Sequence, residues 1–528
     1  MSIYIIFYNI LQEIEGKYGI VNKMTSYKKG GILLLSSIVS CVLMGLDGEI
    51  VKVETDISKG LPSFTIVGLP DMAVRESKER IRAAIKNCGY DFPIKRITIN
   101  LAPANTKKEG THLDLPMAMG ILSASNQIPY TRLKEFAFIG EVSLNGKLNK
   151  VIGVLPIVIS LREKGYKRIV LPKENYDEAS IIEDIEVYPF ENLVEIIKFM
   201  QGELKIDYGV ASTKSDKNEK TYDVDFSEVS GQQSVIRAME IAAAGGHNII
   251  LIGPPGSGKT MLARRFPTIL PDMDIEESIE VTKIYSVTGL LPSNASLMKT
   301  RPFISPHHTA SRVSLIGGGK IPKPGDVSMA HLGVLFLDEL TEFPKNVLEV
   351  LRQPMEDEEV TISRVNATVT YPSKFILVAS MNPCPCGYYN DPKNECNCAP
   401  YQVKKYLSKI SGPLLDRIDM HIEVFPVEYK DLAGKTKSKT SIEIKESVDK
   451  ARIIQQVRYS DEKVRSNSQL PPKLIKKYCE LGPQQSGLLE AAFKKLRLSA
   501  RSYNKIIKLG RTIADLDCSE KIEVKHIS

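Results

Sequence analysis

The chain has 528 residues, which is too long for one hydrophobic core and predicts two to four domains. Hydrophobic residues make up 43% and charged residues 25%, so a fibrous or wholly disordered protein is excluded. The net charge of +7 is unevenly spread, because residues 401–528 hold 26 Lys and Arg against 16 Asp and Glu. This local excess suits a polyanionic partner, and it equally suits a lysine-rich solvated surface.

Near the N-terminus, the apolar run 31–46 follows two lysines and imitates a signal peptide. The run is short for a membrane span, contains three serines, and leads into residues 49–54, which alternate as a strand does. We therefore predict a strand here and no membrane partner. We expect residues 1–34 to be a poorly ordered extension.

The rest of the chain divides by pattern. Strand-like runs such as 97–101 and 168–171 alternate with helix-like ones such as 73–88, which is typical of an α/β domain. A polar stretch then predicts a linker. Apolar residues at intervals of three and four predict helices near the C-terminus. The predicted segments are an α/β domain at 35–205, a linker at 206–226, a second α/β unit at 227–430 and a helical part at 431–528.

The second α/β unit carries a phosphate-binding pattern. The apolar strand 249–252 runs into G-x-x-x-x-G-K-T and then a helix from Met261, and the pattern consists of Gly253, Pro254, Pro255, Gly256, Ser257, Gly258, Lys259 and Thr260. Inward-turned backbone N–H groups and the helix N-terminus attract phosphate oxygens. We expect ATP here, with Lys259 reaching the β- and γ-phosphates and the Thr260 hydroxyl coordinating Mg²⁺.

A matching acidic site follows. The apolar run 334–337 ends in Asp338 and Glu339. We expect Asp338 to meet Mg²⁺ and Glu339 to orient or deprotonate the attacking water. Phosphoryl transfer also needs polar and cationic groups, for which Asn382, Arg417 and Arg501 are candidates. From charge alone, a structural or surface residue is the alternative reading of each, and the one that charge favours.

Five segments together resemble the Mg-chelatase-like AAA+ ATPases, and most closely the ComM/YifB family. They are Gly-Pro-Pro-Gly-Ser-Gly-Lys-Thr, Gly-Val-Leu-Phe-Leu-Asp-Glu-Leu, Leu-Arg-Gln-Pro-Met-Glu, Met-Asn-Pro-Cys-Pro-Cys-Gly and Ser-Gly-Pro-Leu-Leu-Asp-Arg-Ile-Asp. The likeness runs from about residue 35 to the C-terminus. It implies a P-loop AAA+ α/β core and an all-α C-terminal lid.

By this resemblance, Asn382 is expected to be the sensor-1 residue, Arg417 the arginine finger and Arg501 the sensor-2 arginine on the lid. A finger that completes a neighbour's site implies a homo-oligomer, and the family implies a hexameric ring. The resemblance further implies ATP-driven branch migration or helicase action on single-stranded or branched DNA during recombination in natural transformation, in the cytoplasm.

The first α/β domain resembles the Lon protease domain, which has a ribosomal S5 domain 2-type fold, in residues 107–112 and 140–175. Where Lon has its nucleophilic serine this segment offers His112, and near the lysine position it has Val154, Leu155 and Pro156. A Ser-Lys dyad needs both groups, so we predict no peptidase activity.

Two further features concern ligands. Residues 359–370 form two alternating runs around a polar tip, which predicts a β-hairpin. In related ATPases such a hairpin points into the ring pore, which makes Arg364 a candidate DNA contact; the glycine-rich segment 317–320 is a second. An ordinary surface hairpin is the alternative.

Four cysteines fall in one short segment, Cys384, Cys386, Cys396 and Cys398. Four soft ligands suit a Zn²⁺ site. The one-residue spacing is unusual for zinc, because C-x₂-C is the commoner form, and reduced loop cysteines are the alternative.

Three functions are therefore open from sequence. The first is a DNA-directed motor, the second a magnesium-chelatase-I-like metal-insertion or protein-remodelling ATPase, and the third a nucleotide-dependent scaffold. The presence of both Asp338 and Glu339 disfavours the scaffold, because a protein that only binds nucleotide has no need of a hydrolytic acid pair.

Overall fold

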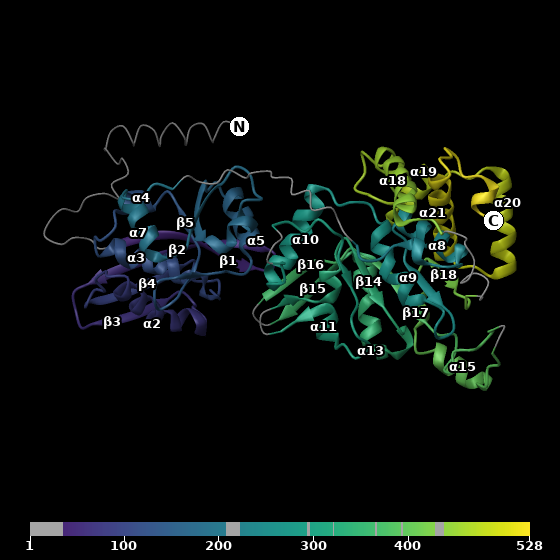
Figure 1. The fold of residues 1–528 in the computed structure, drawn as a ribbon, viewed down its shortest axis with the longest axis horizontal. Coiled ribbons are helices and arrows are strands. Elements are labelled where there is room, and N and C mark those ends of the chain that lie inside the picture. Colours follow the sequence, from purple (N-terminus) through teal and green to yellow (C-terminus); the bar gives the residue numbers. More distant parts are fainter. Residues whose placement is uncertain are drawn as a thin grey trace, which may run out of the picture.

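The computed structural model describes residues 35–206, 222–292, 296–319, 322–364, 367–391, 394–427 and 438–528. The predicted extension 1–34, most of the predicted linker and Lys320 lie outside these residues. Two sheet-containing halves follow one another along the long axis of the molecule, and the C-terminal helices lie at the end away from the first half (Figure 1). The protein is thus a mixed α/β structure.

The first half is built on a mixed sheet of seven strands in the order β3-β4-β2-β1-β5-β8-β9. The apolar run near the N-terminus is one of them, β1, which pairs along its whole length with β2. The strands are β1 Leu35–Met44, β2 Asp47–Ser58, β3 Ser63–Val67, β4 Arg96–Ala102, β5 Ala137–Phe138, β8 Arg168–Pro172 and β9 Glu186–Phe190, with a separate β6 Glu141–Val142 and β7 Leu148–Asn149 pair.

Helices cover this sheet. All eleven residues of α3 are buried, which suits its largely apolar sequence, and its one carboxylate, Asp114, is paired with Arg80 of α2. Helix α2 begins at an Asp71 cap, whose carboxylate accepts from the Val74 N–H. The helices are α2 Met72–Asn87, α3 Asp114–Ala124, α4 Tyr130–Leu133, α5 Val154–Glu163, α6 Tyr176–Ala179 and α7 Leu193–Gln201.

The second half has a five-stranded sheet in the order β11-β14-β17-β10-β18, and every pair in it is parallel. Its strands are short apolar runs, as expected when both faces of a sheet are covered. They are β10 Ile249–Ile252, β11 Phe303–Ile304, β14 Val334–Leu337, β17 Ile376–Met381 and β18 Met420–Glu423. The predicted runs 249–252 and 334–337 coincide with β10 and β14.

The connections of this half carry helices and two small hairpins. The helices are α8 Gln233–Gly245, α9 Lys259–Arg265, α10 Ile275–Thr288, α11 Arg312–Ile316, α12 Asp326–Met329, α13 Lys345–Leu348, α14 Pro354–Asp357, α15 Pro400–Leu407 and α16 Gly412–Leu415. The hairpins are β12 Gly317–Gly318 with β13 Lys323–Pro324, and β15 Glu359–Arg364 with β16 Ala367–Pro372.

The described residues from 438 onward form helices α18 Ser441–Arg458, α19 Pro472–Tyr478, α20 Pro483–Leu496 and α21 Ala500–Leu516. Three apolar residues of α18 enter the core of the parallel sheet, so this helix is packed onto the second half. Phe226, at the end of the predicted linker, is also fully buried in that core, and its N–H donates to the Ser441 hydroxyl at 2.9 Å.

The two halves are in direct contact. The Gly153 N–H, before α5, donates to the Ser286 carbonyl of α10 at 3.1 Å, and the Ser286 hydroxyl donates to the buried Glu178. At the turn between β1 and β2, a Cβ on Gly45 would lie 2.3 Å from a methyl carbon of Val369 in β16. The first half therefore touches the β15–β16 hairpin through its own longest hairpin.

The C-terminal helices are held by one buried carboxylate. Asp515 of α21 is fully buried; it accepts from Arg458 of α18 at 3.0 Å, from Arg511 at 3.0 Å and from Asn467 at 2.8 Å. Removing one partner of a buried ion pair leaves an uncompensated charge.

We expect Asp515→Ala to lower the free energy of unfolding by about 3 kcal/mol, because two arginines are left without their carboxylate. Urea denaturation followed by circular dichroism measures this change. Glu490→Gln, at an exposed pair with Lys494, is the control and should leave the unfolding midpoint unchanged. Equal midpoints for the two variants would contradict the role given to Asp515.

Candidate nucleotide-binding site

The glycine-rich loop lies between β10 and α9, at the carboxyl edge of the parallel sheet. Gly256 and Gly258 have φ of 74° and 86°, a left-handed backbone that glycine adopts without strain. The Gly253 N–H donates to the Met381 carbonyl at 3.2 Å, which ties the loop to the end of β17. Helix α9 begins at Lys259, two residues earlier than the predicted Met261, so the helix N-terminus faces the loop.

The Lys259 ammonium is turned onto the loop itself. It donates to the carbonyls of Gly253 and Pro254, both at 2.8 Å, and to Asn382 Oδ1 at 3.2 Å. Burial lowers the pKa of Lys259, against the raising effect of the Asp338 and Glu339 charges. A phosphate oxygen is a stronger, charge-assisted partner than a carbonyl, so this lysine is held ready for an anion.

The metal-binding pair is also assembled. The Thr260 hydroxyl donates to Asp338 Oδ2 at 2.8 Å, while Asp338 Oδ1 accepts from the Ser380 hydroxyl and from the Glu339 N–H at 3.1 Å. A hydroxyl and a carboxylate side by side are the hard oxygen ligands that Mg²⁺ prefers. These residues therefore fit the ion expected from the sequence.

Glu339 extends from a strained position. Its φ and ψ of 52° and 52° are left-handed, which is uncommon outside glycine. Its Oε2 lies 3.8 Å from His308 Nδ1, and its carboxylate is more than half exposed. An exposed carboxylate beside the phosphate loop is free to take a proton from water.

Two residues at this site were not predicted. Ser380 donates to Asp338 and accepts from the Glu339 N–H at 3.2 Å, so it joins β17 to the acidic pair. His308 follows β11. His308 lies beyond the end of β11 and Ser380 near the end of β17, and both strands end at the same edge of the sheet as β10. The order of the strands, which the sequence does not give, would have been needed to predict them.

The two candidate arginines lie elsewhere. Arg417 lies three residues before β18, and its carbonyl accepts from Asn248, the residue before β10, at 3.1 Å. Arg501 is in the first turn of α21, where Lys505 donates to the Ile418 carbonyl at 2.7 Å. Both arginines therefore lie at the amino edge of the sheet, opposite the phosphate loop, and the structure does not bring them to the site of the same chain.

Glu356 binds both of these arginines. One carboxylate oxygen pairs with Arg417 and the other with Arg501. The hydrogen bond from Arg417, with the charges of both arginines, holds the pKa of Glu356 below its usual value. All three residues line a cavity of about 1140 Å³ between the parallel sheet and the C-terminal helices.

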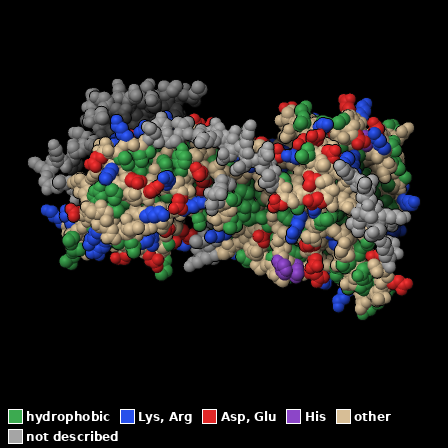
Figure 2. Space-filling model, viewed as in Figure 1, with side chains coloured by type: hydrophobic (Ala, Val, Ile, Leu, Met, Phe, Trp, Pro, Cys, Tyr) green, Lys and Arg blue, Asp and Glu red, His purple; other side chains and the backbone are tan. Residues whose placement is uncertain are grey.

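The predicted hairpin forms, with its tip residues outside the described part of the chain. A Cβ on Gly318 would lie 3.1 Å from an Arg364 guanidinium nitrogen, and a Cβ on Gly317 would lie 2.8 Å from Ile362. The two candidate DNA elements are therefore adjacent. On the face that Figure 2 shows, acidic and basic side chains are interspersed among the described residues, and the basic excess makes no continuous band there.

The region corresponding to a Lon dyad contains no paired nucleophile and base among the described residues. His112 is buried, its Nε2 lies 3.0 Å from the Cys41 carbonyl, and burial lowers its pKa to about 4. Pro156 is buried in α5. The nearby Lys108 is buried too, and it donates to the carbonyls of Pro103 and Thr106. The absence of peptidase activity stays a prediction.

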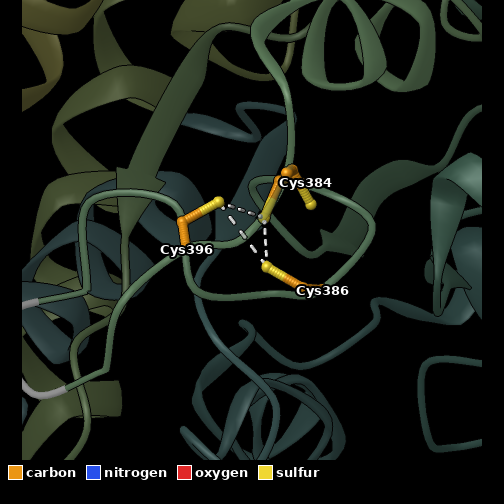
Figure 3. Close-up of side chains that lie close together, drawn as sticks. Cys384, Cys386 and Cys396 are labelled. Atoms are coloured by element: carbon orange, nitrogen blue, oxygen red, sulfur yellow. Dashed lines mark hydrogen bonds between the residues drawn. The ribbon is translucent and has the colours of Figure 1, made fainter.

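The four cysteines converge after β17, and Figure 3 shows three of them, Cys384, Cys386 and Cys396. Three sulfur pairs are 3.3, 3.6 and 3.7 Å apart, and all four ligand atoms lie within 4.8 Å of one another. None of the four is in a disulfide. The edge of a ZnS₄ tetrahedron with Zn–S of about 2.3 Å is about 3.8 Å, so the arrangement is compatible with a metal ion.

A phosphate loop after β10 of a parallel sheet, with an acidic pair after β14 and one strand, β17, between them, defines a P-loop ATPase of the AAA+ type. The chain belongs to the Mg-chelatase-like ComM/YifB family of these ATPases. As an ATPase family, it implies ATP and Mg²⁺.

The family rests on these matches. Residues 225–432 match "Magnesium chelatase, subunit ChlI", residues 53–175 match "Subunit ChlI of Mg-chelatase" and residues 438–528 match "Magnesium chelatase, subunit ChlI C-terminal". The competence protein ComM of Haemophilus influenzae is 42% identical over 503 residues, which cover 94% of this chain and 96% of that protein.

Two further relatives agree. The YifB protein of Escherichia coli is 40% identical over 495 residues, covering 93% of this chain and 96% of that protein. A Lon protease of Buchnera aphidicola is 25% identical over 183 residues, covering 32% of this chain and 23% of the protease. No helix among the described residues has both the length and the apolar character needed to cross a membrane.

We expect Ser380→Ala to lower the rate of ATP hydrolysis by about tenfold while ATP binding is kept, because the hydroxyl that orients Asp338 and the Glu339 backbone is lost. Steady-state hydrolysis and fluorescent-nucleotide titration give the two quantities. Ser373→Ala is the matched control, since Ser373 is buried and its hydroxyl has no hydrogen-bond partner among the described residues. If both variants hydrolyse ATP at the wild-type rate, Ser380 does not position the acidic pair.

Proposed function

We propose that this protein is an ATP-hydrolysing motor that acts on DNA, with a branch migration or helicase activity in DNA recombination or natural transformation. One observation carries the proposal: the phosphate loop with its acidic pair and the two candidate arginines lie at opposite edges of one parallel sheet. A complete hydrolytic site then needs a second copy of the chain.

Each proposed role follows from a contact. Lys259 and the loop N–H groups bind the phosphates, Glu339 takes the proton of the attacking water, and Asn382 orients the γ-phosphate or the water. Thr260 and Asp338 would hold Mg²⁺, which supplies positive charge to the phosphate oxygens. We also propose that the four cysteines bind Zn²⁺, which has a structural and not a catalytic role.

The ring follows from the arginines. Parallel strands put Arg417 and Arg501 on the face away from their own nucleotide, so they serve a neighbour's γ-phosphate as arginine finger and sensor 2. Head-to-tail contacts of this kind close into rings, and we propose a hexamer. In this arrangement residues 35–205 form a Lon-like domain, 227–430 the AAA+ core and 431–528 the lid.

DNA as the partner is supported by three points. Arg364 is exposed and lies against the buried glycines Gly317 and Gly318 of the β12–β13 hairpin, so its guanidinium is held where it can contact phosphate without reading sequence. Glu356, which pairs with both arginines, lies three residues before β15. A movement of the β15–β16 hairpin would therefore be transmitted through Glu356 to the two arginines. The relative in Haemophilus influenzae is named a competence protein. ATP turnover would place the protein in the cytoplasm.

We expect single-stranded or four-way-junction DNA to raise the ATPase rate at least about threefold, and less at 200 mM than at 50 mM salt, because phosphate contacts release counterions. Glu339→Gln should bind ATP and lose at least about 100-fold in rate. Coupled-enzyme ATPase assays measure both. Hydrolysis that is indifferent to every DNA would replace the motor with a chelatase-like or protein-remodelling function.

The same assay tests the hairpin. Arg364→Ala should leave basal hydrolysis unchanged, reduce DNA stimulation and shrink the salt slope by about one, since one phosphate contact is lost. Arg352→Ala removes an arginine of the same half that is exposed and paired with Glu349, and it serves as control. Loss of stimulation in both variants alike would remove Arg364 from the DNA surface.

A shared site makes a second prediction. Lys259→Ala and Arg417→Ala should each abolish hydrolysis, because one variant lacks a phosphate ligand and the other lacks the neighbour's cation. Mixed together, they should regain activity at interfaces where an intact loop meets an intact arginine. The measurement is the ATPase rate against mixing ratio. No recovery in rings shown to exchange subunits would mean that Arg417 does not act across the interface.

A further inference from the structure

The cysteine cluster and the phosphate loop are joined by a very short stretch of chain. Cys384 follows Asn382 by two residues and is fully buried, whereas Cys396 and Cys398 arrive from the far end of the loop, just before α15. Cys386 is only two residues beyond Cys384. Residues 381–387 therefore run from the end of β17 directly into the four-sulfur cluster.

The same residues line the phosphate loop through three separate contacts. The Met381 carbonyl accepts from the Gly253 N–H at 3.2 Å, and Asn382 Oδ1 accepts from Lys259 at 3.2 Å. The third is a packing contact between Gly387 and Pro255. A Cβ on Gly387 would lie 2.5 Å from Cδ and 2.9 Å from Cγ of Pro255, so the backbone at Gly387 rests on the proline ring of the loop.

The spacing of the sulfurs is compatible with one small tetrahedral ion. Separations of 3.3 to 3.7 Å are too long for a disulfide bond of about 2.05 Å and near the edge of a ZnS₄ tetrahedron. Thiolates are soft ligands that select Zn²⁺ over Mg²⁺. Four protein ligands fill the coordination sphere, so the ion has no open position for catalysis and serves structure.

The loop that carries the cysteines has, in its described residues, no regular secondary structure to stabilise it. Within the described part of the loop, residues 382–391 and 394–399 form no helix or strand. The backbone hydrogen bonds there join residues close in sequence, such as the one from the Asn394 N–H to Asp391 at 3.2 Å. Bringing Cys396 and Cys398 back to Cys384 costs loop-closure entropy. Binding of a structural Zn²⁺ supplies folding free energy that offsets this cost.

We propose that a zinc ion held by Cys384, Cys386, Cys396 and Cys398 braces the phosphate loop through Asn382 and Gly387, so that nucleotide affinity depends on the metal. The proposal rests on the proposed function only in that the site binds ATP. Loss of the ion releases the Gly387 backbone from Pro255 and the Asn382 amide from Lys259. The phosphate-binding N–H groups then lose their fixed orientation, which weakens ATP binding.

The test uses the purified full-length chain, its metal content by mass spectrometry and its affinity for a fluorescent ATP analogue. We expect about one zinc per chain in wild type and in Cys518→Ser, an exposed cysteine outside the cluster that serves as control. The double variant Cys396→Ser/Cys398→Ser should lose the zinc and bind nucleotide at least about tenfold more weakly, because the binding groups are misplaced.

A second variant separates the contact from the metal and from misfolding. Gly387→Ala should keep its zinc and still weaken nucleotide binding, because the added Cβ pushes against Pro255. Gly165→Ala is matched to it: Gly165 has φ of 86° against 87° for Gly387, and a Cβ there meets nothing within 4 Å. It should bind nucleotide as wild type does.

Two results overturn the proposal. One is wild-type protein without zinc that takes up none from solution. The other is unchanged nucleotide affinity in both the zinc-free and the Gly387→Ala proteins. Neither readout needs DNA or hydrolysis, so a failure here leaves the motor untouched, and an absence of DNA stimulation leaves the zinc brace untouched.

Discussion

The rest of the structure depends on one parallel sheet, whose two edges hold different sets of charged side chains. Every strand of that sheet points the same way, so groups that follow strands gather at one edge and groups that precede strands gather at the other. Lys259, Thr260 and the acidic pair follow strands; Arg417 precedes one. The nucleotide site and the two candidate arginines are thereby held apart within one chain, which is the physical basis for proposing a ring.

Glu356 and the four-cysteine loop extend this division. At the amino edge, one carboxylate holds both arginines and stands at the base of the β15–β16 hairpin. At the carboxyl edge, the cysteine loop rests on Pro255 of the phosphate loop. The first half of the molecule reaches the same hairpin through the β1–β2 turn at Gly45. The proposed nucleotide, DNA and metal sites would thus all be attached to one parallel sheet.

Much of the local structure was predictable. The sequence correctly predicted the strands 249–252 and 334–337 and the hairpin at 359–370. These elements were predictable because short apolar runs and alternating patterns depend only on residues that are close together in the sequence. The family was also evident from contiguous motifs. The sequence did not predict Ser380 and His308 as site residues, because a serine inside a strand and a histidine after one have no local signature. Only the order of the strands brings them close to Asp338 and Glu339.

The sequence by itself determined the chemistry of the nucleotide site, since a G-x-x-x-x-G-K-T loop acts through backbone groups and side chains that are adjacent in the chain. It also determined the family and the presence of four thiols. Only the tertiary structure decided that Arg417 and Arg501 converge on Glu356 away from the phosphate loop, that the sulfurs lie at tetrahedral spacing, and that Gly387 touches Pro255. Each of these depends on segments far apart in the chain, whose meeting is set by sheet order and packing rather than by local pattern.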